Sequence, residues 1–282
     1  MTQAQARNVY SSRLGILLTG ATGFVGRAVQ EVSGVTDWSE ATLESLPPHS
    51  VIIHLGAHVS DTPEARDTNR RLDTEVVRAA SSTGSRLIYA STNNVYGLAR
   101  DCETTDALHP AGDYAQSKVD GESLVRSELG AAGEICRIPD VFGVGQRHGN
   151  FFRAIETSVQ EGSPLMQFGA GAKLRTYIRV DDLARVLLWL VGHPPEATES
   201  ETRVWNLGYG DSKTVAEIVA TVAQETGLPV EHRDVPGDTS AQDVRTLRVT
   251  PLPEGTLAFP TCDAALRDYV RSLSTHPERE FA

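Results

Sequence analysis

The 282-residue sequence is poor in the features that mark membrane, secreted and nucleic-acid-binding proteins. It has no apolar run near the roughly 20 residues that span a bilayer. Its three cysteines, Cys102, Cys136 and Cys262, are too widely spaced for a disulfide framework or a metal site. The 26 Lys and Arg against 37 Asp and Glu give a net charge of −11 without a basic block, which excludes binding to nucleic-acid phosphates. We therefore expect reduced, buried or incidental thiols, and no metal, nucleic-acid or membrane partner.

Short apolar runs alternate with helical patterns along most of the chain. Residues 1–13 lack the apolar core of a secretion signal, so we expect a flexible tail on a cytoplasmic protein. The alternation predicts an α/β fold with a parallel sheet covered on both faces. The runs are GILLT (15–19), VIIHL (51–55), RLIYA (86–90) and EICRI (134–138), and the helical patterns begin near Ala65, Asp113, Asp181 and Thr214.

The first apolar run leads into the glycine-rich segment TGATGFVG, at the predicted start of a helix. Its glycines, spaced three apart, let the backbone turn tightly and approach a pyrophosphate, which then sits on the helix N-terminus. The alternative is that the glycines serve only the strand-to-helix turn. The position favours a Rossmann-type dinucleotide site. Its candidate residues are Gly20, Thr22, Gly23, Phe24, Val25, Gly26 and Arg27 in the turn, with Leu55, Gly56 and Ala57 after the next apolar run.

The region after this turn is shorter than a dinucleotide fold requires. A second strand normally ends in an acidic ribose ligand about 20 residues on. Here Pro47 and Pro48 lead straight into the VIIHL run, with room only for a helix of about two turns, capped by Asp37 or Ser39. We therefore predict that the first half lacks one strand–helix unit. Asp37 and Trp38 are candidates for the adenine side, and the choice between NAD and NADP stays open.

A tyrosine and a lysine stand four residues apart in DYAQSK, so Tyr114 and Lys118 share one face of a predicted helix. An ammonium beside a phenol favours the phenolate, and we expect Lys118 to lower the pKa of Tyr114. The RLIYA run ends in STNNVYG, where Thr92 offers a hydroxyl to the same substrate oxygen. We predict that these three residues are catalytic and that Tyr96 packs beneath the site.

Six segments, in chain order and at nearly the usual intervals, resemble motifs of the extended short-chain dehydrogenase/reductase family, chiefly its nucleotide-sugar epimerases, dehydratases and reductases. They are TGATGFVG, VIIHLGA, STNNVYG, YAQSK, RIPDVFG and RTYIRVDDLA, and the resemblance covers about Leu14 to Gly227. It implies NAD or NADP as cofactor, a nucleotide-sugar substrate and a Thr92–Tyr114–Lys118 triad in which Lys118 holds the nicotinamide ribose. It also implies a cofactor-site role for Asn69, phosphate contacts for Arg147 and Arg175, and a homodimer joined through the helices near Ala65 and Asp113.

Two departures from the family pattern restrict the reaction. Asn93 and Asn94 stand where dehydrating relatives carry an acid and a base, and neutral amides do not transfer protons at useful pKa values. Asp140 stands where the family commonly has asparagine, which puts a phosphate contact there in doubt. The candidate substrate residues are Thr92, Asn93, Asn94, Asp140, Arg147 and Arg175.

These residues leave three functions. We favour the reduction of a 4-keto sugar nucleotide with Tyr114 as proton donor, ahead of a sugar-nucleotide 4-epimerase and a non-catalytic dinucleotide-sensing module. We expect residues 14–142 plus about 173–207 to form the dinucleotide-binding domain. We expect about 143–172 plus 208–282 to form a small substrate-binding lobe.

Overall fold

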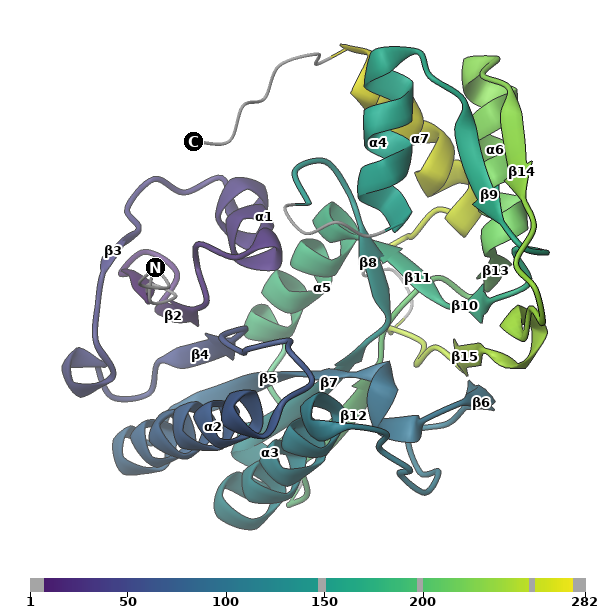
Figure 1. The fold of residues 1–282 in the computed structure, drawn as a ribbon. Coiled ribbons are helices and arrows are strands. Elements are labelled where there is room, and N and C mark those ends of the chain that lie inside the picture. Colours follow the sequence, from purple (N-terminus) through teal and green to yellow (C-terminus); the bar gives the residue numbers. More distant parts are fainter. Residues whose placement is uncertain (1–7, 147–150, 197–199, 254–256, 276–282) are drawn as a thin grey trace. The chain divides into compact units, whose positions relative to one another are not determined.

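The computed structural model describes residues 8–146, 151–196, 200–253 and 257–275 (Figure 1). These residues form two compact units. The predicted domains differ from these units at residues 98–103, 139–142 and 173–180, which group with the second unit because their strands pair there. The first unit comprises the chain up to Gly97, Thr104–Ile138 and Asp181–Leu207, and the second comprises Leu98–Glu103, Pro139–Val180 and the chain from Gly208 on.

A seven-stranded sheet forms the centre of the first unit, in the order β12-β7-β5-β4-β2-β1-β3. The run from β12 to β2 is parallel throughout, which confirms the predicted Rossmann-like sheet. Because both faces of these strands are covered, they read as continuous apolar runs in the sequence. Their bounds are β2 (Ile16–Thr19), β4 (Val51–His54), β5 (Arg86–Thr92), β7 (Gly133–Ile138) and β12 (Arg203–Asn206).

Helices cover both faces of this sheet (Figure 1). The helices α2 (Pro63–Thr83) and α3 (Asp113–Leu129) pack side by side on one face, and α1 (Phe24–Ser33) and α5 (Val180–Gly192) lie on the other. Between α2, α3 and the strands lies an apolar core that includes Ile52, Val76, Leu87, Val125 and Ile135. This core fixes the faces of α2 and α3 that pack against each other and the sheet.

The amino-terminal edge of the sheet differs from the sequence-based expectation. Residues 9–11, expected in a flexible tail, form β1 (Val9–Ser11), which pairs antiparallel with β2 and with β3 (Ser39–Glu40). The expected two-turn helix after Asp37 is also absent; the described residues there form β3 and the short 3-10 helix η1 (Leu43–Ser45). Between α1 and β4, where every residue is described, there is no full strand–helix unit, as predicted.

In its described residues, the second unit contains smaller sheets and three α-helices. Phe142, Phe152, Tyr177 and Tyr269 form an aromatic cluster in this unit. Its helices are α4 (Phe151–Glu161), α6 (Val215–Thr226) and α7 (Cys262–Thr275), and its strands are β6 (Ala99–Cys102), β8 (Asp140–Phe142), β9 (Leu165–Phe168), β10 (Leu174–Arg175), β11 (Tyr177–Arg179), β13 (Lys213–Thr214), β14 (Val230–Arg233) and β15 (Val244–Leu247). Short 3-10 helices are η2 (Asn93–Tyr96) and η3 (Gly130–Ala132) in the first unit and η4 (Ser240–Gln242) in the second.

The three cysteines are buried free thiols, as predicted. In the part of the chain that the structure describes, no helix is both long and apolar enough to cross a membrane. The same residues contain no group of three or more His, Cys, Asp or Glu side chains placed to hold a metal ion.

Candidate active site

The glycine turn between β2 and α1 approaches the end of β4 closely. Gly20 has a φ of +68°, and a Cβ on it would lie 2.8 Å from the backbone nitrogen of Gly56. A Cβ on Gly26 would overlap the carbonyl oxygen of Gly20. These two glycines are therefore required by the packing of the turn itself, and the structural interpretation of the motif holds for them.

Gly23 has a different environment. It is the N-cap of α1 with an ordinary φ of −72°, and a Cβ there would meet only the Gly20 carbonyl oxygen, at 3.0 Å. No side chain among the described residues caps this helix end. Arg27 folds back and donates to the Thr22 carbonyl oxygen (2.7 Å). The turn thus presents free backbone N–H groups at the positive end of α1, which fits a pyrophosphate.

The loop after β4 is fixed from two sides. The Gly56 N–H donates to Thr19 Oγ1 (3.1 Å), which joins the carboxyl ends of β2 and β4. The buried amide of Asn69 on α2 accepts from the His58 N–H (2.7 Å) and donates to the His58 carbonyl oxygen (2.9 Å) and to Ser117 Oγ (3.0 Å). Asn69 therefore fastens this loop to α3, and a direct contact with the cofactor stays a prediction.

The three predicted catalytic residues lie on adjoining elements of the first unit. Thr92 ends β5 and caps η2, where its Oγ1 accepts from the Asn94 N–H (3.3 Å) and donates to Asn93 Oδ1 (3.4 Å). Helix α3 packs against β5 and η2 and carries Tyr114 and Lys118 one turn apart. Since Gly112, the N-cap of α3, has no side chain, the Asp61 carboxylate accepts from the Tyr114 N–H (3.1 Å) in its place.

The expected lowering of the Tyr114 pKa was wrong. Burial, with the negative charge of Asp73 adding to it, raises the pKa of Tyr114 to about 12. Lys118 is only 2% exposed. Burial lowers the pKa of Lys118, while the Asp73 and Glu122 carboxylates oppose that shift. The phenol is therefore held in its protonated form by its loss of water and by a nearby anion.

A buried polar network beneath the site was not found from the sequence. Arg137 on β7 forms a bidentate ion pair with Glu122 of α3, with nitrogen–oxygen distances of 3.0 and 2.8 Å. Arg137 also donates to the Tyr96 hydroxyl, which in turn donates to Asn206 Oδ1 (2.8 Å). Tyr96 is thus structural, as predicted. Two sequence features could have indicated this network: an arginine inside an apolar strand and a glutamate one turn after Lys118.

Asp37 and Trp38, the candidates for the adenine side, both have partners within the protein, and their contact with adenine stays a prediction. The Asp37 carboxylate accepts from the Ser11 hydroxyl (2.7 Å), the Ser12 hydroxyl (3.1 Å) and the Arg13 N–H (2.9 Å), and these bonds lower its pKa. The Trp38 indole N–H donates to Ser33 Oγ (3.3 Å). Asp37 therefore stabilises the turn between β1 and β2. This role could not be predicted from the sequence, because β1 was not expected.

Two of the predicted substrate residues pair with each other in the second unit. Arg175 Nε lies 3.4 Å from Asp140 Oδ2, and Arg175 Nη2 lies 2.7 Å from Asp243 Oδ1. Arg175 Nη1 also donates to the Asp243 carbonyl oxygen (2.6 Å), and the arginine side chain is 11% exposed. This guanidinium is already engaged by acceptors of the protein, and its phosphate contact stays a prediction. Arg147 lies outside the described residues.

Comparison with known proteins identifies the family. A family model described as the NAD dependent epimerase/dehydratase family matches residues 35–208, more than half of the chain, and begins after the glycine turn. Methionine adenosyltransferase 2 subunit beta of Danio rerio is 27% identical over 256 residues, covering 79% of this chain and 77% of that protein.

Solved structures share the fold at low identity. MoeE5 in complex with UDP-glucose and NAD is 23% identical, with a TM-score of 0.75 over 93% of this chain and 99% of that chain. RMD from Pseudomonas aeruginosa complexed with NADPH is 20% identical, with a TM-score of 0.72 over 92% of this chain and 98% of that chain.

Proposed function

This chain belongs to the NAD dependent epimerase/dehydratase family, and we propose that it reduces the keto group of a nucleotide-activated sugar, most specifically a 4-keto group. The environment of Tyr114 supports the choice of reduction, because burial and the charge of Asp73 raise its pKa to about 12 and so favour a hydroxyl that donates a proton. A reductase needs this phenol as a proton donor, whereas an epimerase must first use it as a base to oxidise the sugar.

The neighbours of Thr92 argue against a further reaction, the dehydration of the sugar. Asn93 is buried, Asn94 is half-buried, and both are amides at the end of β5 where a dehydratase needs an acid and a base. An amide side chain donates and accepts hydrogen bonds but holds no transferable proton near neutral pH. These residues orient a sugar without eliminating water from it.

The residues of the first unit fit a nicotinamide dinucleotide, the cofactor of this family. The uncapped N-terminus of α1 and the bare Gly23 would hold the pyrophosphate, and Lys118 would hold the nicotinamide ribose. When bound, the reduced nicotinamide supplies the hydride. Thr92 Oγ1 would orient the substrate carbonyl, and the Tyr114 hydroxyl would deliver a proton to its oxygen as the alcohol forms.

Isotope transfer tests this assignment. The purified protein is incubated with nucleotide-linked 4-keto sugars and reduced NAD or NADP that carries deuterium at the transferable position. Reduction places one deuterium in the product for each dinucleotide oxidised, and Tyr114→Phe should abolish it. With oxidised NAD or NADP and the corresponding nucleotide-linked 4-hydroxy sugars, interconversion of the two C4 isomers without net reduction of the dinucleotide would instead establish an epimerase.

A second candidate is a dinucleotide-binding subunit without turnover. The similarity to a protein named as a subunit of methionine adenosyltransferase supports it. Tight dinucleotide binding with no isotope transfer to any nucleotide sugar, by protein whose fold is verified, would favour this candidate over both enzymes. Such a result would also leave Tyr114 without a catalytic role.

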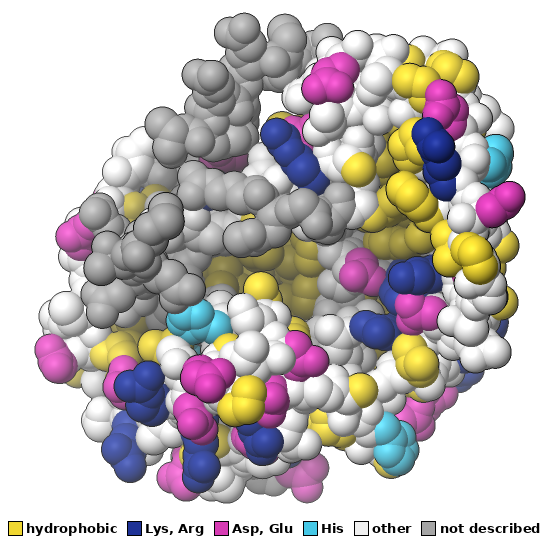
Figure 2. Space-filling view, in the orientation of Figure 1, with side chains coloured by type: hydrophobic (Ala, Val, Ile, Leu, Met, Phe, Trp, Pro, Cys, Tyr) yellow, Lys and Arg dark blue, Asp and Glu magenta, His cyan; other side chains and the backbone are white. Residues whose placement is uncertain are grey.

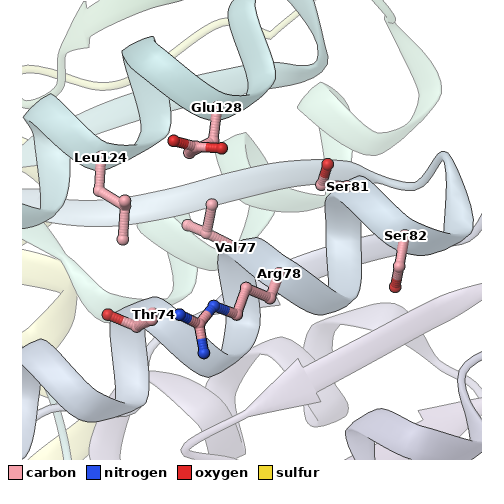
Figure 3. Close-up of a pocket in the computed structure, with 7 residues that line it drawn as sticks. All are labelled: Thr74, Val77, Arg78, Ser81, Ser82, Leu124 and Glu128. Carbon is pink, nitrogen blue, oxygen red and sulfur yellow. The ribbon is translucent and has the colours of Figure 1, made fainter.

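We also propose a homodimer joined through α2 and α3, in a cytoplasmic protein. A groove between these two helices is lined by Thr74, Val77, Arg78, Ser81, Ser82, Leu124 and Glu128 (Figure 3). Basic and acidic side chains are intermixed over the lower part of the molecule in Figure 2, where α2 and α3 lie in Figure 1. Mixed charges around a groove with an apolar floor of Val77 and Leu124 favour a second copy of this chain as the occupant.

A further inference from the structure

A chain of buried polar side chains runs from the glycine turn to Lys118 within the first unit. A hydrogen bond joins Thr19 Oγ1 and His54 Nδ1 (2.6 Å), and His54 Nε2 donates to Asp73 Oδ1 (3.0 Å). The Tyr89 hydroxyl donates to the other carboxylate oxygen, Asp73 Oδ2 (2.8 Å). The face of the Tyr89 ring meets the Lys118 ammonium, with Nζ 4.7 Å from the ring centroid.

All of the side chains in this polar chain are buried. His54, Asp73, Tyr89 and Lys118 are each at most 2% exposed. Gly121 lies on α3, about one turn after Lys118. A Cβ at this position would overlap both the Tyr89 hydroxyl and Asp73 Oδ2, so only glycine leaves room for them. Burying a carboxylate costs free energy unless the carboxylate is paired with an opposite charge and fully hydrogen-bonded. We therefore expect this buried carboxylate to have a function.

Within the described residues, the Lys118 ammonium forms no direct ion pair; it faces the ring of Tyr89. Two carboxylates act on it from a distance, Asp73 from α2 and Glu122 from its own helix. Glu122 is already neutralised by its bidentate pair with Arg137. Asp73 is therefore the anion whose charge is left to balance the lysine, with Tyr89 between them.

We propose that Asp73 is a positioning residue of this site, which acts through Tyr89 on the Lys118 ammonium and through His54 and Thr19 on the floor of the glycine turn. The two segments that would contact a dinucleotide, at Gly56 and at Lys118, are thereby parts of one buried unit, joined by hydrogen bonds and by the cation–π contact of Lys118 with Tyr89. Only the role given to Lys118 rests on the proposed function; the coupling itself does not.

The charge of Asp73 shifts the pKa values of its neighbours in a defined direction. Although burial opposes ionisation of Asp73, hydrogen bonding from His54 and the charge of Lys118 lower the pKa of this carboxyl below its usual value, so it is an anion at neutral pH. Burial and the Asp73 charge raise the pKa of Tyr89 well above its usual value, so its hydroxyl remains a donor. Removing the Asp73 charge must then lower the pKa values of both Lys118 and Tyr114, because Asp73 raises each of them.

The lysine content of the chain makes a direct test practical. The sequence has three lysines, Lys118, Lys173 and Lys213. Protein labelled with ¹³C at the lysine Cε therefore gives three signals, whose titration with pH is followed without any substrate. Lys173 and Lys213 belong to the second unit and serve as internal references.

Asp73→Asn is expected to lower the titration midpoint of Lys118 by about one pH unit and to leave the two reference lysines unchanged. Glu75→Gln, which removes one exposed charge from the helix that carries Asp73, should move none of them. In the reduction assay Asp73→Asn should also shift the alkaline limb of the rate to lower pH, because Tyr114 loses its proton earlier. A protein that proves not to reduce sugars would leave the lysine titration intact, so the two proposals fail separately.

A second variant covers the case in which Asp73→Asn does not fold. Gly121→Ala should displace Asp73 and Tyr89 away from α3 and lower the Lys118 midpoint, while Gly192→Ala, where a Cβ meets nothing within 4 Å, should not. In the wild-type protein the Lys118 signal should already be shifted upfield by the Tyr89 ring. The proposal is overturned if that ring-current shift is absent, or if either folded variant keeps the Lys118 midpoint within about 0.3 pH unit of wild type.

Discussion

The three glycines of the turn make a sharp test, because the structure assigns them different tasks. Gly20 and Gly26 are required by close backbone packing, whereas Gly23 has ordinary dihedral angles and one neighbour, the Gly20 carbonyl oxygen at 3.0 Å. If a pyrophosphate binds at the N-terminus of α1, the absence of a side chain at Gly23 is required by the ligand and not by the packing of the fold. Gly23→Ala should therefore separate binding from stability.

The magnitudes follow from the geometry. At position 23 the added methyl group needs a shift of a few tenths of an ångström, and alanine is a poorer N-cap than glycine, so we expect a stability loss of about 1 kcal/mol. At position 26 the methyl overlaps backbone atoms of Gly20 and Ala21, and overpacking of this kind costs about 1–3 kcal/mol or more. Dinucleotide affinity should fall at least tenfold in Gly23→Ala, which corresponds to about 1.4 kcal/mol.

Urea unfolding measures the first quantity, and fluorescence titration with reduced NAD and NADP measures the second. Gly34→Ala is the matched control, since Gly34 follows the same helix, has a φ of +64° and meets nothing within 4 Å. It should lose about 1 kcal/mol of stability from its left-handed backbone and keep its dinucleotide affinity. Wild-type affinity in Gly23→Ala would refute the argument and leave the motif a structural turn only.

Three further predictions concern chemistry, cofactor choice and assembly. Tyr114→Phe should retain the unfolding free energy within about 1 kcal/mol and lose about 100- to 10,000-fold in turnover, and activity within about threefold of wild type would contradict its role. Since Asp37 is engaged by Ser11, Ser12 and Arg13, we expect discrimination between NAD and NADP below about tenfold, because each ribose contact is worth about 1 kcal/mol; a hundredfold preference in titration would mean that a specific 2′ contact exists. Leu124→Arg should convert the expected dimer to a monomer in sedimentation, and a wild-type monomer at tens of micromolar would count against the dimer.

The sequence sufficed for features that depend on local pattern. The apolar runs located β2, β4, β5 and β7, and the spacing of Tyr114 and Lys118 placed them on one face of α3. Helix-period and strand-period patterns are properties of neighbouring residues, so they can be read without knowledge of the tertiary fold. The shortened segment after α1 was also evident, because there was no room for another strand and helix.

Features that depend on distant residues were missed or misjudged. The sign of the Tyr114 shift depends on burial and on Asp73, a residue of another helix. The polar chain through His54 and Tyr89 joins five elements, β2, β4, α2, β5 and α3. Its only local trace in the sequence was the presence of ionisable or hydroxyl-bearing residues in apolar strands. Local spacing shows that a lysine is near a tyrosine, but not which other charge has the larger effect on it.

The amino-terminal strand β1 explains how the edge of β2 is covered although one strand–helix unit is missing. Loss of a parallel neighbour would leave the edge of β2 with unpaired backbone groups, although this strand is fully buried. Residues 9–11 pair with β2 instead, and β3 then pairs with β1, so the edge is covered by antiparallel strands that need no crossover helix. Asp37 stabilises this arrangement by binding Ser11, Ser12 and Arg13. The bonds that stabilise these edge strands therefore also engage Asp37, the predicted adenine-side carboxylate. This is why we propose that the glycine turn and Lys118 are the main contacts to the dinucleotide.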